Sequence, residues 1–243
     1  MMQIEGRQQV LVGLRRNKVE RILLADSAHG NVIDEIVSLA CENQVDLRYV
    51  PKEDIESKSK VRNNQGIIAY LKNWDYTNLD SLLAQSKKEK YPLVLILDHL
   101  QDPHNLGAIM RSADATGVSG VIIPKDRSVK MTETVVKTSA GAALTVPLIM
   151  VTNLSQTIDV LKDEGFWIMG TDADTTEYIY DKNLKMPLAL IIGSEGKGIS
   201  NNLAKKSDFL VKLPMEGTIT SLNASVAAGV MMYEILRQRQ FDS

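Results

Sequence analysis

The stretch LVLILD at residues 93–98 consists of five consecutive apolar residues followed by an aspartate. An uninterrupted apolar run of this length is typical of a strand that is buried on both faces of a parallel sheet. The stretch LALIIG at residues 188–193 has the same character. We therefore expect both stretches to be buried strands of a parallel sheet.

Strand-like and helix-like segments alternate around these two stretches. Further strand-like segments are GVIIP (120–124), PLIMV (147–151), FWIMGT (166–171) and FLVKLP (209–214). Helical patterns cover residues 105–117, residues 151–165 and the C-terminal end of the chain. Such alternation indicates an open α/β sheet, which places ligands at the carboxyl ends of its strands. The loops after Asp98, Gly193 and Leu213 are therefore candidate positions for a functional site.

The first part of the chain has a different organisation. Its short helical and strand-like segments end with the apolar strand QGIIAYL (65–71). The segment that follows is mostly polar and charged, with one short amphipathic piece, as is common in linkers. We expect a small N-terminal α/β domain of residues 1–73, a linker of residues 74–91 and a larger domain of residues 92–243.

The composition is that of a globular protein, with 44% hydrophobic and 24% charged residues. No apolar run reaches the ~18 residues of a membrane span, and the N-terminus lacks the apolar region of a secretory signal. Cys41 is the only cysteine, so an internal disulfide is excluded and a cytoplasmic location is expected. We expect Cys41 to be a small buried hydrophobic residue.

The net charge of −2 neither supports nor excludes a nucleic-acid partner. The N-terminal domain contains a basic cluster with few acidic neighbours, which consists of Arg7, Arg15, Arg16, Lys18 and Arg21. This basic cluster could bind phosphate, or it could be the solvated face of a helix.

A glycine-rich segment, GSEGKGIS, begins at the end of the second buried strand and covers residues 193–200. A phosphate-binding P-loop would need lysine directly after its last glycine, where this chain has Ile199. A dinucleotide-binding fingerprint would need glycine at the position of Asn201. What remains is a turn that carries one carboxylate, Glu195, and whose glycines allow the backbone to approach a ligand closely. A purely structural turn is the alternative.

The segment DHLQDPHNLGAIMR (98–111) begins at the end of the first buried strand. Its two histidines and two aspartates do not have the spacing of a standard metal site. We expect instead a turn at Asp102–Pro103 and a helix capped by Asn105. Arg111 then lies near the carboxyl edge of the sheet, where it could bind a phosphate or carboxylate, or form a surface salt bridge.

The segment KLPMEGTITSLNAS (212–225) leads into the C-terminal helix. Thr220 or Ser221 is expected to cap this helix. Asn223 and Ser225 then have no capping role, and asparagine lowers helix propensity. Their presence favours a functional site at this end of the helix.

Together, the three segments resemble the SpoU/TrmH family of RNA 2′-O-ribose methyltransferases, which use S-adenosylmethionine. The first family motif is matched by Asn105, Gly107 and Arg111. The second is matched by Gly193, Glu195, Gly196 and Gly198. The third is matched by Leu213, Pro214, Met215, Gly217, Ser221, Leu222, Asn223, Ser225 and Ala227. The three motifs occur in the order that the family has.

The N-terminal part resembles the ribosomal-protein-like RNA-binding domain that some family members carry. IEGRQQV (4–10) and NNQGIIA (63–69) match the two ends of that domain. The likeness is closest to the RlmB-like branch, which methylates a guanosine in large-subunit ribosomal RNA. That branch often has histidine before the Gln-Gly pair, where this chain has Asn64.

The resemblance implies a fold and an assembly. Family members have an α/β catalytic domain with a mostly parallel sheet flanked by helices, in which the C-terminal chain passes through an earlier loop and forms a deep trefoil knot. The C-terminal helix also lies at the interface of a homodimer, where small residues such as Gly229 would allow close packing. Glycine inside a helix costs about 1 kcal/mol relative to alanine, so a compensating contact is expected.

The resemblance also implies the site residues. The donor, S-adenosylmethionine, would be held largely by backbone around Thr171, Gly193, Leu213, Met215 and Leu222. The substrate would be bound and oriented by Arg111, Asn105, Glu195, Ser221 and Asn223. A guanidinium with a pKa above about 12 is a poor base, so the arginine is expected to stabilise phosphate and the developing alkoxide. The proton acceptor, either the glutamate or water, stays open, and no metal ion is required.

Ribosomal RNA is the expected substrate, and transfer RNA is the second choice because of the additional N-terminal domain. An RNA-binding assembly factor without methylation activity would be a different class of protein. The intact set of Asn105, Arg111, Glu195 and Asn223 argues against that class.

Overall fold

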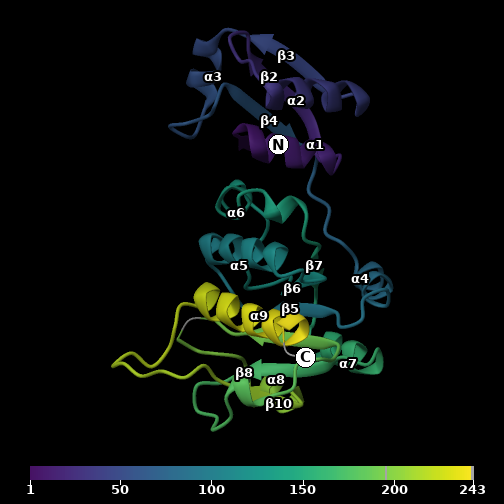
Figure 1. Cartoon of the computed structure of the whole chain (residues 1–243), viewed down its shortest axis with the longest axis vertical. Helices are drawn as coiled ribbons and strands as arrows, with labels where there is room; N and C mark the ends of the chain where they lie inside the picture. Colours follow the sequence, from purple (N-terminus) through teal and green to yellow (C-terminus); the bar gives the residue numbers. More distant parts are fainter. Residues whose placement is uncertain (195, 242–243) are drawn as a thin grey trace. The chain divides into compact units, whose positions relative to one another are not determined.

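The computed structural model describes residues 1–194 and 196–241 (Figure 1). These residues form two compact units. Unit 1 contains residues 1–75 and 131–145, and unit 2 contains residues 76–130 and the described part of residues 146–243. Residues 131–145, a segment of the predicted larger domain, thus pack with the N-terminal part of the chain.

Unit 1 is built on a four-stranded mixed sheet with the order β1-β4-β2-β3. Its strands are β1 (Met2–Glu5), β2 (Val19–Ala25), β3 (Asp46–Val50) and β4 (Ile67–Leu71). β4 is antiparallel to both of its neighbours, whereas β2 and β3 are parallel. All residues of β4 except Tyr70 are buried, which agrees with the central position of this apolar strand.

The helices of unit 1 are α1 (Arg7–Arg15), α2 (Asn31–Glu42), α3 (Lys52–Lys58), α6 (Glu133–Thr138) and a 3-10 helix (Ala142–Leu144). α1 and α2 pack against each other, and α6 packs against β1. α2 buries Ile33, Ile36 and Ala40, which share one face at helical spacing. Cys41 is exposed, so the prediction that it is buried was wrong. Cys41 directly follows the buried Ala40, and successive side chains of a helix point in different directions, so Cys41 faces away from the buried side of α2.

Unit 2 contains a six-stranded sheet with the order β10-β8-β9-β5-β6-β7, in which every strand pair is parallel. Its strands are β5 (Leu93–Leu97), β6 (Gly120–Pro124), β7 (Leu148–Val151), β8 (Trp167–Thr171), β9 (Leu188–Ile192) and β10 (Phe209–Val211). β5 and β9 are adjacent, and all their residues are buried. The predicted α/β fold with a parallel sheet flanked by helices is therefore confirmed.

The helices of unit 2 are α4 (Leu79–Ser86), α5 (Pro103–Ala115), α7 (Leu154–Asp163), α8 (Asn201–Lys206), α9 (Ala224–Phe241) and a 3-10 helix (Ile179–Asp181). α5 packs along α9, as Figure 1 shows in teal and yellow. α4 lies within the segment predicted as a linker, where Leu82 and Leu83 are buried in the core cluster of the unit. No described helix has the length and hydropathy needed to span a membrane.

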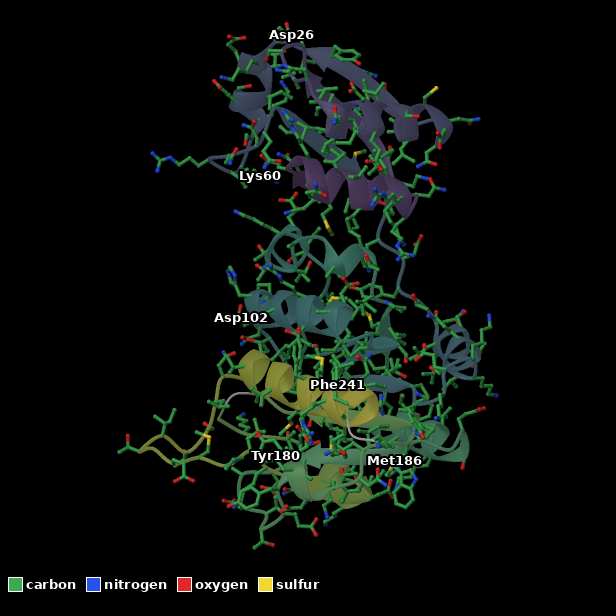
Figure 2. The ribbon with its side chains drawn as sticks, viewed as in Figure 1. Asp26, Lys60, Asp102, Tyr180, Met186 and Phe241 are labelled. Carbon is green, nitrogen blue, oxygen red and sulfur yellow. The ribbon has the colours of Figure 1, made fainter. Side chains whose placement is uncertain are left out.

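The helix α5 begins with a cap that differs from the predicted one. α5 begins at Pro103, and the side chain of Asp102, labelled in Figure 2, accepts a hydrogen bond from the backbone N–H of His104 at 2.8 Å. Asn105 is therefore not the cap. Proline is tolerated at the first position of a helix because a backbone N–H at that position would have no hydrogen-bond partner within the helix.

Candidate active site

The carboxyl ends of four adjacent strands form one edge of the sheet in unit 2. Val211 of β10 pairs with Thr171 of β8, and Gly170 pairs with Ile191 of β9. Ile192 in turn pairs with Leu97 of β5. The loops that carry the predicted site residues all leave the sheet at this edge, because parallel strands end on the same side.

The glycine-rich turn after β9 is held closed by its own backbone. Ser194 donates to the carbonyl of Gly198 at 3.2 Å, and Gly198 donates back to the carbonyl of Ser194 at 3.0 Å. A Cβ atom on Gly193 would lie 2.1 Å from the carbonyl carbon of Gly198, so only glycine fits there. Gly196 and Gly198 have φ angles of 79° and 64°, which favour glycine. Glu195, a predicted site residue, lies outside the described residues.

Asp98 connects this turn to the loop after β5. Its side chain is 2% exposed, and its Oδ2 atom accepts a hydrogen bond from the backbone N–H of Ser200 at 2.6 Å. Its Oδ1 atom contacts Nδ1 of His99. The loop after Asp98 was predicted as a candidate position for the site, but Asp98 itself was weighed only as a metal ligand; its place directly after a buried strand was the available signal. Among the described residues no group of three or more His, Cys, Asp or Glu could hold a metal ion.

Asn105 and Asn223 meet although they are 118 positions apart in the chain: Nδ2 of Asn223 donates to Oδ1 of Asn105 at 3.0 Å. Asn105 is 6% exposed and lies in the first turn of α5. This hydrogen bond joins the first and the third predicted motif at the carboxyl edge of the sheet.

Asn223 also caps α9, which corrects the expectation that Thr220 or Ser221 would do so. Its Oδ1 atom accepts hydrogen bonds from the backbone N–H groups of Ser225 at 2.9 Å and Val226 at 3.3 Å. The hydroxyl of Ser225 donates to the same oxygen at 2.6 Å. Both polar residues therefore stabilise the first turn of the helix, and the expectation that they have no capping role was wrong.

Arg111 projects from α5 and is exposed. Within the part of the chain that the structure describes, its guanidinium forms no ion pair, so the alternative of a surface salt bridge finds no support there. An Arg side chain has N–H donors in a planar fork that fits phosphate. Its position is therefore suited to binding an anionic substrate.

The segment between β10 and α9 carries the remaining predicted residues. Leu213 is buried, Met215 and Leu222 are half-buried, and Ser221 is exposed. The backbone of residues 214–222 makes no backbone–backbone hydrogen bond with another described residue. Peptide groups without a backbone partner can form hydrogen bonds with a ligand. This fits the expectation that backbone groups hold most of the S-adenosylmethionine molecule.

One cavity of about 350 Å³ opens at the other half of the same edge. Its lining includes Asp98, His99, Arg127, Asn153 and Ser200, but none of the predicted donor-binding residues. The loops after β6 and β7 contain no recognisable motif and were not predicted as positions of the site.

Comparison with sequence models of known families identifies both parts of the chain. Residues 92–233 match the SpoU rRNA Methylase family, and residues 3–77 match the RNA 2′-O ribose methyltransferase substrate binding family. The chain belongs to the SpoU methylase family. The resemblance stated from the three motifs is thereby confirmed.

Curated relatives carry the same family name. A TrmH family tRNA/rRNA methyltransferase of Staphylococcus saprophyticus is 47% identical over 224 residues, which is 92% of this chain and 90% of the relative. The TrmH family tRNA/rRNA methyltransferase YacO of Bacillus subtilis is 43% identical over 236 residues, which is 96% of this chain and 94% of the relative.

Solved structures of family members have the same fold. The SpoU methyltransferase AviRb from Streptomyces viridochromogenes, crystallised with AdoMet, aligns with a TM-score of 0.82 at 23% identity over 98% of this chain and 90% of its own. A TrmH/SpoU tRNA modifying enzyme of A. aeolicus aligns with a TM-score of 0.57 at 29% identity over 67% of this chain and 82% of its own. The protein is an S-adenosylmethionine-dependent RNA methyltransferase of the SpoU family.

Proposed function

We propose that this protein methylates the 2′-hydroxyl of a guanosine ribose in ribosomal RNA. The hydrogen bond between Asn223 and Asn105 supports the proposal, because it joins two of the three family motifs. S-adenosylmethionine supplies an electrophilic methyl group when it is bound. The residues of the chain align the hydroxyl with that group, and alignment contributes much of the catalysis of a displacement reaction.

Each predicted site residue has a proposed role. Arg111 binds the substrate phosphate and stabilises the developing alkoxide, since a guanidinium does not lose its proton at neutral pH. Asn105 and Ser221 orient the ribose. Asn223 is a positioning residue, because its amide is engaged by Asn105 and by the first turn of α9. Glu195 or a water molecule accepts the proton.

The donor site is proposed at the shared edge of β8, β9 and β10. Thr171, Gly193 and Leu213 each lie at or just beyond a strand end there, and Met215 and Leu222 belong to the segment that follows β10. No side chain fits at Gly193, so the turn there has only backbone with which to contact a ligand. We also propose that the C-terminal chain forms the trefoil knot around this site.

We propose that the protein works as a homodimer through α9. A groove of about 1010 Å³ runs along α9 and α5, and exposed apolar side chains line it. They are Tyr180, Val226, Val230, Tyr233 and Phe241. Contiguous exposed apolar surface of this kind marks a protein interface. Gly229 lies in the same groove, and a Cβ on it would lie 3.6 Å from Oγ of Ser112, an ordinary contact.

The experiment that tests the function is a map of 2′-O-methyl groups in cellular RNA, in cells with and without the gene. Loss of one methyl group from a guanosine of ribosomal RNA is the expected result. Loss from transfer RNA alone would favour the second substrate class, which the names of the relatives include. Unchanged methylation in both RNAs would contradict the proposal. Fractionation of the same cells tests the proposed cytoplasmic location.

A further inference from the structure

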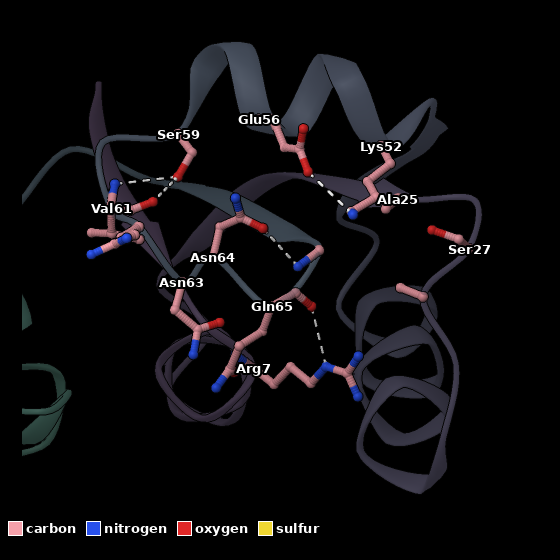
Figure 3. Close-up of a pocket in the computed structure, with 13 residues that line it drawn as sticks. Arg7, Ala25, Ser27, Lys52, Glu56, Ser59, Val61, Asn63, Asn64 and Gln65 are labelled. Atoms are coloured by element: carbon pink, nitrogen blue, oxygen red, sulfur yellow. Dashed lines mark hydrogen bonds and ion pairs between the residues drawn. The ribbon is translucent and has the colours of Figure 1, made fainter.

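Unit 1 contains a cavity of about 490 Å³ beside the end of β2 and the start of α3 (Figure 3). Its lining consists of Arg7, Ala25, Ser27, Ala28, Lys52, Glu56, Ser59 and residues 61–66. The volume falls within the range of about 300–1,000 Å³ that is usual for small-ligand sites. No aromatic side chain lines it.

The near end of the loop that lines this cavity is anchored by a buried carboxylate. Glu5 is 9% exposed and accepts hydrogen bonds from the backbone N–H of Lys60 at 2.7 Å and from the hydroxyl of Ser59 at 2.5 Å. Gln3 donates to the same carboxylate at 2.9 Å. A buried carboxylate with three donors holds its partners in one arrangement, so this end of the loop is preformed.

The far end of the loop is held through amide oxygens. Oδ1 of Asn64 accepts from the backbone N–H of Gly66 at 2.8 Å, and Oε1 of Gln65 accepts from the backbone N–H of Arg7 at 2.8 Å. Arg7 in turn donates to the carbonyl oxygens of Gln65 and His29. The acceptor end of each amide is used, and neither N–H₂ group donates to another described residue, so the donors of Asn64 and Gln65 are available to a ligand.

The charge balance of the cavity is positive. Arg7, Lys52 and Arg62 line it together with one carboxylate, Glu56, which lies 3.2 Å from the ammonium of Lys52. Arg62 is exposed and makes no hydrogen bond or ion pair with any described residue. The lining also carries the side-chain amides of Asn63, Asn64 and Gln65. Hydrogen-bond donors on amides and on cations suit a ligand that is rich in acceptors and negatively charged.

Arg7 lines the cavity, but the other members of the basic cluster named from the sequence lie outside it. Arg15 pairs with Glu35 at 2.5 Å, and Arg21 pairs with Asp46 at 2.9 Å. The ammonium of Lys18 lies 5.4 Å from the ring centre of Trp74. Two of the five cations of that cluster, Arg15 and Arg21, are thus paired with carboxylates of unit 1, whereas Arg62 pairs with no described carboxylate.

We propose that this cavity binds one unpaired nucleotide of the RNA substrate, with its phosphate at Arg62 and Lys52 and its base at the amides of Asn63, Asn64 and Gln65. The inference rests on the proposed function for the identity of the ligand as RNA. An unpaired nucleotide is required because the base edges in an A-form helix are paired and cannot reach side chains in a pocket. Hydrogen bonds rather than stacking select the base, since the lining has no aromatic ring.

The test measures binding of a fluorescein-labelled, single-stranded 12-nucleotide RNA of mixed sequence to the full-length protein by fluorescence anisotropy, over a series of salt concentrations. Arg62→Gln should weaken binding about ten-fold at low salt and reduce the slope of log K against log salt by about 0.7, the value for one phosphate of a single strand. Asn63→Ala should weaken binding without a change in slope. Arg16→Gln is the matched control, because Arg16 is an exposed arginine of the same unit outside the cavity.

Equal effects of Arg62→Gln and Arg16→Gln on affinity and slope would overturn the proposal. Displacement of the RNA by polyglutamate of equal charge would also overturn it, because the cavity would then bind any acidic chain. Binding of S-adenosylmethionine by both variants should equal that of wild type. If the wild-type protein transfers no methyl group to RNA, the proposed function fails, while the comparison of the two arginine variants still decides the binding site.

Discussion

Substitution of Asn223 separates two roles that the structure gives to one side chain. Its Oδ1 atom caps α9, and its Nδ2 atom donates to Asn105. Asn223→Ala removes both interactions, whereas Asn223→Asp keeps an oxygen for the cap and removes the donor. A carboxylate at a helix N-terminus also interacts favourably with the helix dipole.

The expected magnitudes follow from these contacts. Loss of an N-cap costs about 1 kcal/mol, and loss of a hydrogen bond to the mostly buried Asn105 costs about 1 kcal/mol more. Asn223→Ala should therefore lower the free energy of unfolding by about 2 kcal/mol, and Asn223→Asp by about 1 kcal/mol. Both should reduce methyl transfer to RNA, because the amide that holds Asn105 is absent from both.

Urea denaturation followed by circular dichroism gives the stabilities, and incorporation of radiolabelled methyl groups into RNA gives the activities. If Asn223→Asp is as unstable as Asn223→Ala, the capping role is wrong. If Asn223→Asp retains the wild-type rate, the hydrogen bond to Asn105 does not position the site, and the reasoning that links the two motifs is refuted.

Three further predictions concern single residues of unit 2. Arg111→Ala should lower the rate of radiolabelled-methyl transfer at least ten-fold, about 1.4 kcal/mol in the barrier, with unchanged calorimetric affinity for S-adenosylmethionine; a smaller loss would contradict its role. Gly193→Ala should abolish donor binding, because its Cβ would lie 2.1 Å from the backbone of Gly198; calorimetry measures this, and normal affinity would show that the turn is not part of the donor site. Arg239 donates to the carbonyl oxygens of Tyr91, Leu184 and Met186, and burial lowers its pKa to about 10, so it is still charged at neutral pH. Arg239→Ala should lower the free energy of unfolding by about 2 kcal/mol in thermal or urea denaturation, and a fully stable variant would show that this contact contributes little.

The parallel strands and the motif residues could be predicted from the sequence because each depends on a local pattern. The apolar runs at 93–98 and 188–193 identify buried strands without knowledge of their neighbours, since burial on both faces requires apolar residues at every position. The glycines of the turn after β9 are identified in the same way, because positive φ angles favour glycine.

The helix caps show where local patterns mislead. Asp102 and Asn223 cap α5 and α9, whereas Asn105 and Thr220 or Ser221 were expected from the sequence. A cap requires non-helical φ and ψ at one residue, and the residue at which the helix begins depends on how the preceding loop leaves the sheet. The exposure of Cys41 has a similar cause, because it depends on which face of α2 meets the sheet and α1.

Only the tertiary structure decided which motif residues meet. The contacts Asn105–Asn223 and Asp98–Ser200 join residues 118 and 102 positions apart, and no spacing rule in the sequence encodes them. They arise because β5 and β9 lie side by side in the sheet, and because α9 packs back along α5. Strand order and helix docking are set by the burial of apolar surface over the whole unit, so side chains at the edge of the sheet are brought together by a core to which they contribute little.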